Sequence, residues 1–119
     1  MTKLVHIQAG TVLKEYPLLE GTVRIGRNTD NDICLDDITV SGQHAVLDVT
    51  PSAYLDGIND IYIVDQKSTN GTVINGQYIK RHLFKHGEVA QIGQHEFKLV
   101  DEESLGFERT MVFIPEDDQ

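Results

Sequence analysis

The stretch Thr72-Val73-Ile74-Asn75-Gly76-Gln77-Tyr78-Ile79 joins two short runs of apolar and β-branched residues through an Asn-Gly pair. Both residues of such a pair accept a positive φ, which a type I′ turn requires at its two central positions. The stretch therefore predicts a tight β-hairpin. Gly10 and Gly93-Gln94 predict similar turns in the first and last hairpins.

Similar short runs recur along the rest of the chain with turn residues between them, and helical periodicity is absent. Many short strands at this spacing are typical of an all-β sandwich or barrel. The segment from Pro51 to Asn59 is rich in turn-forming residues and predicts a longer excursion between strands. The predicted strands are Leu4–Gln8, Thr11–Glu15, Thr22–Gly26, Ile33–Leu35, His44–Val49, Ile61–Val64, Thr72–Ile74, Gln77–Ile79, Glu88–Ile92 and His95–Val100.

The size and composition are those of a small globular protein. With 119 residues, 39% hydrophobic and 24% charged, the chain is expected to fold around a single core. The lone Cys34 cannot form an internal disulfide, which favours a reducing compartment. Neither an apolar signal region nor a membrane-length apolar run occurs in the sequence. A soluble, cytoplasmic protein is expected.

The net charge of −9 is unevenly distributed. Residues 101–119 hold seven acids and one arginine, so most of the negative charge lies there. We therefore expect a folded domain over residues 1–100 and an acidic tail over 101–119. Generic nucleic-acid binding needs a basic stripe, which this sequence lacks, so nucleic acid is not an expected partner.

The first of three informative loops follows a predicted strand that ends at Gly26. Arg27 comes directly after this glycine, and its planar guanidinium offers a fork of donors suited to a phosphate or carboxylate. The alternative is a solvated ion pair with one of the acids nearby. Those acids are Asp30, Asp32, Asp36 and Asp37.

The second loop contains Ser41 and His44 ahead of an apolar strand. In a hydrolase, Ser41 would be the nucleophile and His44 its base, but the Gly-x-Ser-x-Gly elbow of such enzymes is missing from the sequence. The alternative is structural. In that case Ser41 bonds its own turn, and His44 is a buried histidine with satisfied ring nitrogens.

The third loop completes a pattern. Gly26-Arg27, Ser41-x-x-His44 and Ser68-Thr69-Asn70-Gly71-Thr72, with Asn75-Gly76 beyond, together resemble a forkhead-associated (FHA) domain over roughly Leu4 to Val100. The resemblance implies a β-sandwich of two twisted, mostly antiparallel sheets that binds phosphothreonine peptides through loops at one end. It also implies no catalytic activity and no cofactor.

The resemblance further implies a role for each matching residue. Arg27 would contact the phosphate, and Ser41 would donate a hydrogen bond to a second phosphate oxygen. Thr69 would shape the pocket around the threonine methyl, and Asn70 would bond the peptide backbone. The scaffold of the site would be Gly26, His44, Gly71, Asn75 and Gly76, with the glycines serving positive-φ turns.

Chemistry independent of the family supports these roles. A phosphothreonine carries about −1.5 to −2 charges and three strong acceptors, which one arginine, one hydroxyl and nearby amides would satisfy. Burying the threonine methyl is worth about 1 kcal/mol or somewhat more, which gives roughly tenfold discrimination against serine.

The chain departs from the family at one position. Many members place an arginine or asparagine right after the binding serine, where this chain has Gly42. We therefore expect modest affinity, with Lys67 compensating as a point charge. Gly42, Lys67 and Ser68 are taken as peripheral to the site.

The sequence thus predicts a phosphothreonine-binding adaptor module in Ser/Thr kinase signalling, which is not an enzyme. Its partner would be a phosphorylated protein or peptide, with a Ser/Thr kinase upstream and no membrane involved. The alternative function is that of a structural FHA-like sandwich that associates with other proteins through a sheet face, without phosphate.

Other constellations do not predict a metal site. His82 and His86 have helical ligand spacing but lie between strand signals, and we expect two surface histidines. The run Asp30-Asn31-Asp32 opens like a calcium loop, yet Leu35 stands where that loop needs glycine. Cys34 is expected to be a buried small side chain.

The tail contains an apolar, strand-like segment over residues 107–114. It is expected to be a plain tail or a strand that docks on the body. A sharper hypothesis makes Thr110 a kinase target, whose phosphorylated form binds the pocket of its own chain or of a neighbour. Glu108 and Phe113 would supply acidic and apolar flanks.

Overall fold

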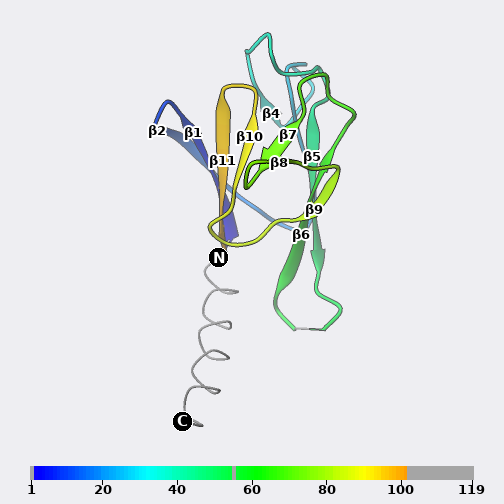
Figure 1. Ribbon diagram of the computed structural model, residues 1–119. Helices are drawn as coiled ribbons and strands as arrows, with labels where there is room; N and C mark the ends of the chain where they lie inside the picture. Colours follow the sequence, from blue (N-terminus) through cyan, green and yellow to red (C-terminus); the bar gives the residue numbers. More distant parts are fainter. Residues whose placement is uncertain (1, 55, 102–119) are drawn as a thin grey trace.

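The protein is a sandwich of two β-sheets in a computed structural model that describes residues 2–54 and 56–101 (Figure 1). One sheet has the order β2 (Thr11–Pro17), β1 (Thr2–Gln8), β11 (His95–Asp101), β10 (Val89–Ile92), β7 (Thr72–Ile74) and β8 (Gln77–Tyr78). The other has the order β4 (Ile33–Cys34), β3 (Gly21–Gly26), β5 (Ala45–Pro51), β6 (Asn59–Asp65) and β9 (Arg81–Leu83). The all-β prediction is confirmed.

Pairing between neighbouring strands is antiparallel except between β3 and β4, which run parallel. Successive side chains of a strand point to opposite faces of its sheet, so every second side chain faces the other sheet and is buried. In β5, Ala45, Leu47 and Val49 are buried, whereas Val46 and Asp48 between them are partly exposed. Strands from both sheets contribute to one core, whose largest fully buried side chain is that of Phe97.

The predicted hairpin turn after β7 is confirmed, because Asn75 has φ 55° and Gly76 has φ 77°. Ala9 and Gly10, with φ 51° and 79°, form the same kind of turn between β1 and β2. In the last hairpin Gly93 has φ 59° but Gln94 is not in the positive region. A positive φ at the first position alone fits a type II′ turn rather than type I′.

Strand β9 was not predicted from the sequence. Its three residues lack apolar alternation, and two of them, Arg81 and Leu83, are exposed at the sheet edge. Backbone pairing with β6 and the Arg81 guanidinium, which lies 3.8 Å from the centroid of the Tyr62 ring, hold this strand in place. These are long-range contacts without a local sequence signal.

The histidines at positions 82 and 86 are partly exposed, and each ring has a partner. His82 Nε2 lies 3.0 Å from Glu88 Oε1, and His86 Nδ1 accepts the Asp101 N–H at 2.9 Å. The His82 ring therefore ties β9 to the residue before β10, and the His86 ring ties the β9–β10 loop to the end of β11.

The expectation that Cys34 is buried is wrong. Cys34 is exposed, because the alternation in β4 turns Ile33 and then Leu35 toward the core and Cys34 outward. Its Sγ lies 3.4 Å from the Arg27 carbonyl oxygen.

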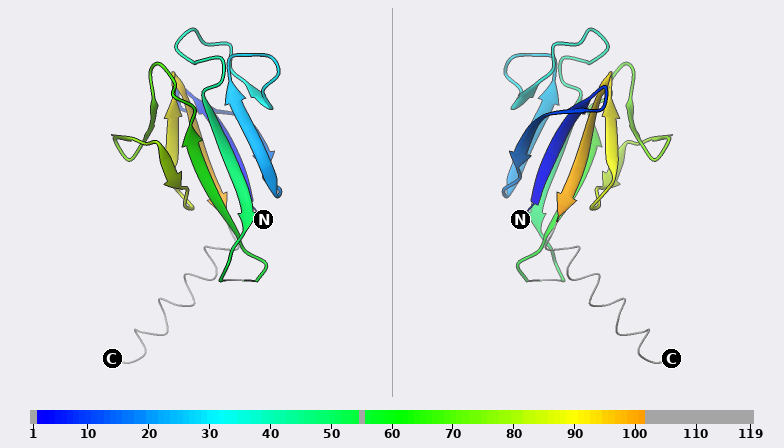
Figure 2. Two further views of the ribbon diagram at one scale, coloured as in Figure 1. Left: turned by 90° about the vertical axis from the view of Figure 1, so that its right-hand side faces the viewer. Right: turned by 90° about the vertical axis from the view of Figure 1, so that its left-hand side faces the viewer.

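The loops that follow β3, β4 and β6 gather at the end of the sandwich opposite the N-terminus (Figure 2). The β5–β6 loop lies at the other end. Within the described residues, the chain forms no helix with the length and apolar character of a membrane span. Thr110 and the segment 107–114 lie outside the described residues.

Candidate functional site

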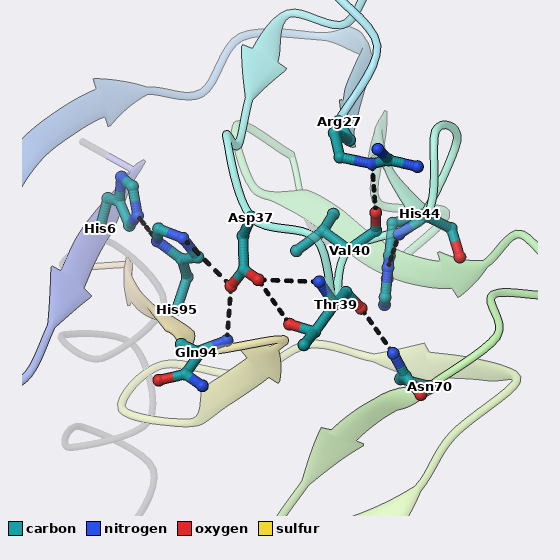
Figure 3. Close-up of polar contacts among 10 residues, drawn as sticks. His6, Arg27, Asp37, Thr39, Val40, His44, Asn70, Gln94 and His95 are labelled. Atoms are coloured by element: carbon teal, nitrogen blue, oxygen red, sulfur yellow. Dashed lines mark hydrogen bonds and ion pairs between the residues drawn. The ribbon is translucent and has the colours of Figure 1, made fainter.

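The three loops over residues 27–32, 35–44 and 66–71 are joined by hydrogen bonds that converge on residues 39–41. Each of these three consecutive residues accepts a bond from a different predicted site residue, and Figure 3 shows the bonds to Thr39 and Val40. The bonds run from Asn70 Nδ2 to the Thr39 carbonyl (2.8 Å), from Arg27 Nε to the Val40 carbonyl (3.0 Å) and from the Thr69 N–H to Ser41 Oγ (3.0 Å). The fold thus brings Arg27, Ser41, Thr69 and Asn70 together.

Arg27 leaves β3 on the exposed surface of this end. Its N–H donates to the Ser41 carbonyl at 2.9 Å, and its Nε bond fixes the base of the guanidinium. The terminal nitrogens engage none of the described residues. Three of the four nearby acids have other partners, since Asp30 accepts from Gln43, Asp32 from the Arg24 N–H and Asp37 from Thr39. The ion-pair alternative for Arg27 is therefore not what the structure shows.

Ser41 is half-buried, and its hydroxyl oxygen is used as an acceptor within the protein. Oγ accepts the Thr69 N–H, which leaves the hydroxyl hydrogen free to donate. The Ser41 hydroxyl can therefore serve as a donor to an anion above the loops.

His44 is fully buried and ties three segments together. Its ring Nδ1 accepts the Ser41 N–H at 3.1 Å, so the ring hydrogen lies on Nε2, which donates to the Gly71 carbonyl at 2.9 Å. Its main chain bonds Ile25 and Gln66. Because both ring nitrogens are occupied, His44 cannot take a proton from Ser41 Oγ, and these two residues do not form a hydrolytic pair.

Asp65 organises the third loop and was missed from the sequence. Its carboxylate accepts the Ser68 N–H and hydroxyl, at 3.0 and 2.6 Å, and the Thr72 hydroxyl at 2.8 Å. Burial alone would raise the pKa of Asp65, but the hydrogen bonds from Ser68 and Thr72 outweigh burial and hold the pKa below its usual value. An aspartate three residues before a serine, at the start of a turn, was the available signal.

Ser68 and Lys67 differ in their freedom to reach a ligand. The Ser68 hydroxyl donates to Asp65 and accepts the Gly71 N–H at 3.0 Å, so its hydrogen is already committed. Lys67 is exposed, and its amine engages none of the described residues. Its φ of 57° is unusual for a lysine. The bonds around Asp65 hold this conformation in place.

Gly26 and Gly42 allow a close approach of two loops. A Cβ at Gly26 would collide with the Gly42 carbonyl and lie 2.7 Å from Asn31 Nδ2. Gly26 does not have a positive φ, so the expectation that it serves a positive-φ turn is wrong, and close packing is the reason for glycine. A Cβ at Gly42 would meet the end of the Asn28 side chain at 2.9 Å, which can move aside.

Gly71, Gly76 and Asn75 do adopt positive φ, but they do not lie together. Gly71 (φ 86°) is in the third loop, where a Cβ would approach the Tyr78 ring within 2.7 Å. Asn75 and Gly76 form the β7–β8 turn, outside the three loops, and Asn75 Nδ2 bonds Glu88 at 3.0 Å.

Asn31 joins the first two loops and was missed as a scaffold residue. Its buried side chain donates from Nδ2 to the Gly42 carbonyl at 2.7 Å and to the Asn28 carbonyl at 2.9 Å.

Among the residues that the structure describes, no group of three or more His, Cys, Asp or Glu side chains could hold a metal ion.

A groove of about 340 Å³ lies beside Asn70 and is lined in part by Thr39, Val73 and Tyr78. A larger hollow of about 580 Å³ lies near Leu18 and Asp101 and contains none of the predicted site residues. Of the predicted site residues, Asn70 and Gly71 line the smaller groove.

Several known proteins are similar to this chain in sequence. Relatives include the ABC transporter ATP-binding/permease protein Rv1747 of Mycobacterium tuberculosis, 35% identical over 80% of this chain and 10% of the relative. The glycogen accumulation regulator GarA of Mycolicibacterium smegmatis is 38% identical over 71% of this chain and 48% of the relative. The chain thus spans about half or less of the length of these two relatives.

Solved structures agree. The FHA domain of FhaA, in complex with the intracellular domain of Rv3910, has a TM-score of 0.68 at 28% identity, covering 83% of this chain and 99% of that one. Mycobacterium tuberculosis EmbR, in complex with a low affinity phosphopeptide, has a TM-score of 0.67 at 33% identity, covering 83% and 24%. The family model of the FHA domain matches residues 23–93. Since that match spans more than half of the sequence, this chain belongs to the FHA domain family.

Proposed function

We propose that this chain is a phosphothreonine-binding adaptor module of Ser/Thr kinase signalling, which positions a phosphorylated partner and performs no chemistry. One observation carries the proposal. The Arg27 guanidinium and the Ser41 hydroxyl are fixed by bonds to residues 40 and 69, while the terminal nitrogens of one and the hydroxyl hydrogen of the other remain free to donate.

The phosphate would lie over these two residues. Arg27 donates two parallel hydrogen bonds to phosphate oxygens, Ser41 donates one, and the Lys67 amine adds charge at the rim. Hydrogen bonds to charged groups are worth about 1.5–3 kcal/mol each, so the loss of one costs roughly tenfold or more in affinity.

The peptide main chain would lie along Asn70. Because Nδ2 donates one hydrogen to the Thr39 carbonyl, the side chain keeps its Oδ1 and a second hydrogen for a peptide N–H and C=O. The Thr69 side chain, exposed next to Ser41, would contact the threonine methyl. Gly42 adds no side-chain contact, so Lys67 supplies the additional charge.

The proposal is consistent with an intracellular setting. The free, exposed thiol of Cys34 persists best in a reducing compartment. We place the module in the cytoplasm, where a Ser/Thr kinase would phosphorylate its partner.

An NMR titration with matched peptides tests this function. Three versions of one peptide carry phosphothreonine, phosphoserine or threonine at the same position, and a second series is built on residues 108–114 with Thr110 phosphorylated. We expect amide shifts confined to the three loops, saturating with phosphothreonine at a lower concentration than with phosphoserine, and weakening as salt is added.

Equal responses to all three versions would contradict the proposal and favour phosphate-independent association. In that case the shifts would map to a sheet face, and added salt would not weaken the interaction.

A further inference from the structure

A line of polar contacts joins the first sheet to Asn70 (Figure 3). It begins with two histidines far apart in the sequence, His6 in β1 and His95 at the start of β11, whose Nε2 and Nδ1 atoms are 2.8 Å apart. The other nitrogen of the His95 ring, Nε2, lies 3.6 Å from Asp37 Oδ2. The His6–His95 pair therefore lies next to Asp37, an acid of the second loop.

Asp37 holds the segment that carries Thr39. Its Oδ1 accepts both the Thr39 N–H, at 2.8 Å, and the Thr39 hydroxyl, at 2.7 Å. Its Oδ2 accepts the Gln94 N–H at 3.1 Å. The Thr39 carbonyl in turn accepts the Asn70 side-chain bond. One carboxylate thus links the β10–β11 turn to the residue that holds Asn70.

Hydrogen bonds keep Asp37 in its carboxylate form although its side chain is largely buried. The side chains of His95 and Asp37 are 9% and 11% exposed. Hydrogen bonds from Thr39, then from Gln94, lower the pKa of Asp37 against the opposing effect of burial, with His95 contributing least. Lys14, across from His6 in β2, places its amine 5.0 Å from the centroid of the Tyr16 ring.

We propose that Asp37 is a positioning residue for peptide recognition, which sets the place of the Asn70 amide through Thr39 and is itself held by His95. This inference rests on the proposed function. Asp37 need not touch the peptide, since it acts through the Thr39 carbonyl.

The neighbouring Asp36 supplies a matched control. It has the same charge, lies in the same loop and is exposed, and it has no hydrogen bond or ion pair among the described residues. Asp37→Asn removes the charge and replaces an accepting oxygen with a donor that cannot satisfy the Gln94 N–H. Asp36→Asn makes the same change in charge without disturbing Thr39.

The experiment is a double-mutant cycle read by calorimetry with the phosphothreonine peptide. We expect Asp37→Asn to weaken binding about fivefold and Asp36→Asn less than about twofold. In an Asn70→Ala background, Asp37→Asn should have almost no further effect, because the residue through which it acts is gone. Equal effects of the two aspartate variants, or effects of Asp37→Asn and Asn70→Ala that multiply in full, would overturn the inference.

Two further measurements keep the test decisive. If Asp37→Asn does not fold, His95→Gln replaces it, with a loss of about twofold that should also vanish in the Asn70→Ala background. The Asn70 side-chain amide signal of the free protein should shift in Asp37→Asn and not in Asp36→Asn, and an unchanged signal would count against the inference.

The Arg27→Ala variant separates failure of the inference from failure of the proposed function. If Arg27→Ala retains binding, the proposed function fails. If Arg27→Ala loses binding while the two aspartate variants match, the inference alone fails.

Discussion

The two ends of the sandwich are built differently. At the end that carries the site, residues 39–41 accept bonds from three residues of two other loops, and the buried His44 ring joins the second loop to the third. At the other end, the β5–β6 loop has bonds within itself, from the Ser52 N–H to the Ile58 carbonyl and from the Tyr54 N–H to Ser52 Oγ. At the site end, hydrogen bonds from polar side chains hold the loops together, so these residues should matter for both stability and binding.

The largest expected effect separates these two ends directly. His44→Ala removes a fully buried ring and two hydrogen bonds, and should lower the free energy of unfolding by about 3–5 kcal/mol. Tyr54→Ala removes a larger ring, but Tyr54 is 93% exposed, so the free energy of unfolding should change by less than about 0.5 kcal/mol. Urea denaturation of both variants measures the difference, and similar midpoints would show that the two ends do not differ as described.

A smaller effect concerns one glycine from each end. Gly26→Ala forces a Cβ against the Gly42 carbonyl and should cost about 3 kcal/mol. Gly57→Ala meets no atom within 4 Å, and its cost should be limited to about 1 kcal/mol for the left-handed φ of 77°. Thermal unfolding of the pair checks this, and a Gly26→Ala protein as stable as Gly57→Ala would argue against close loop packing.

Local patterns were enough to predict much of the fold, and the residues named from the family resemblance, Arg27, Ser41, Thr69 and Asn70, are ones that the fold brings together. The Asn75-Gly76 turn and most strands follow from turn chemistry and alternation, which act over a few residues. Strand β9, the role of Asn31 and the pairing of His6 with His95 depend on contacts between distant segments, so local patterns could not reveal them. Cys34 was misjudged because a two-residue strand gives too little alternation to orient a side chain.

The smallest effect is a dependence of stability on pH. Burial, and then the neighbouring His95, lower the pKa of His6 in the folded protein. The unfolded chain therefore binds a proton more readily, and stability should fall as pH drops below about 6.5. The lowered pKa values of Asp37, Asp65 and Glu88 affect stability in a different pH range, because the stabilisation that these carboxylates contribute is lost only below about pH 4.

His6→Phe separates the two ranges. Phenylalanine keeps the stacking against Phe97 and cannot be protonated, so the loss of stability between about pH 7 and 5 should shrink in this variant. Urea midpoints across this range measure it, and an unchanged slope would assign the pH dependence to another group.

The most direct test of the central claim compares two exposed arginines at the end of one strand. Arg27 holds its guanidinium over the site, whereas Arg24, three residues earlier, lies 3.8 Å from Asp32. Calorimetric titration with the phosphothreonine peptide should show a loss of roughly 100-fold for Arg27→Ala and less than about twofold for Arg24→Ala, with both proteins folded. Equal affinities for the two variants would contradict the assignment of Arg27 to the phosphate.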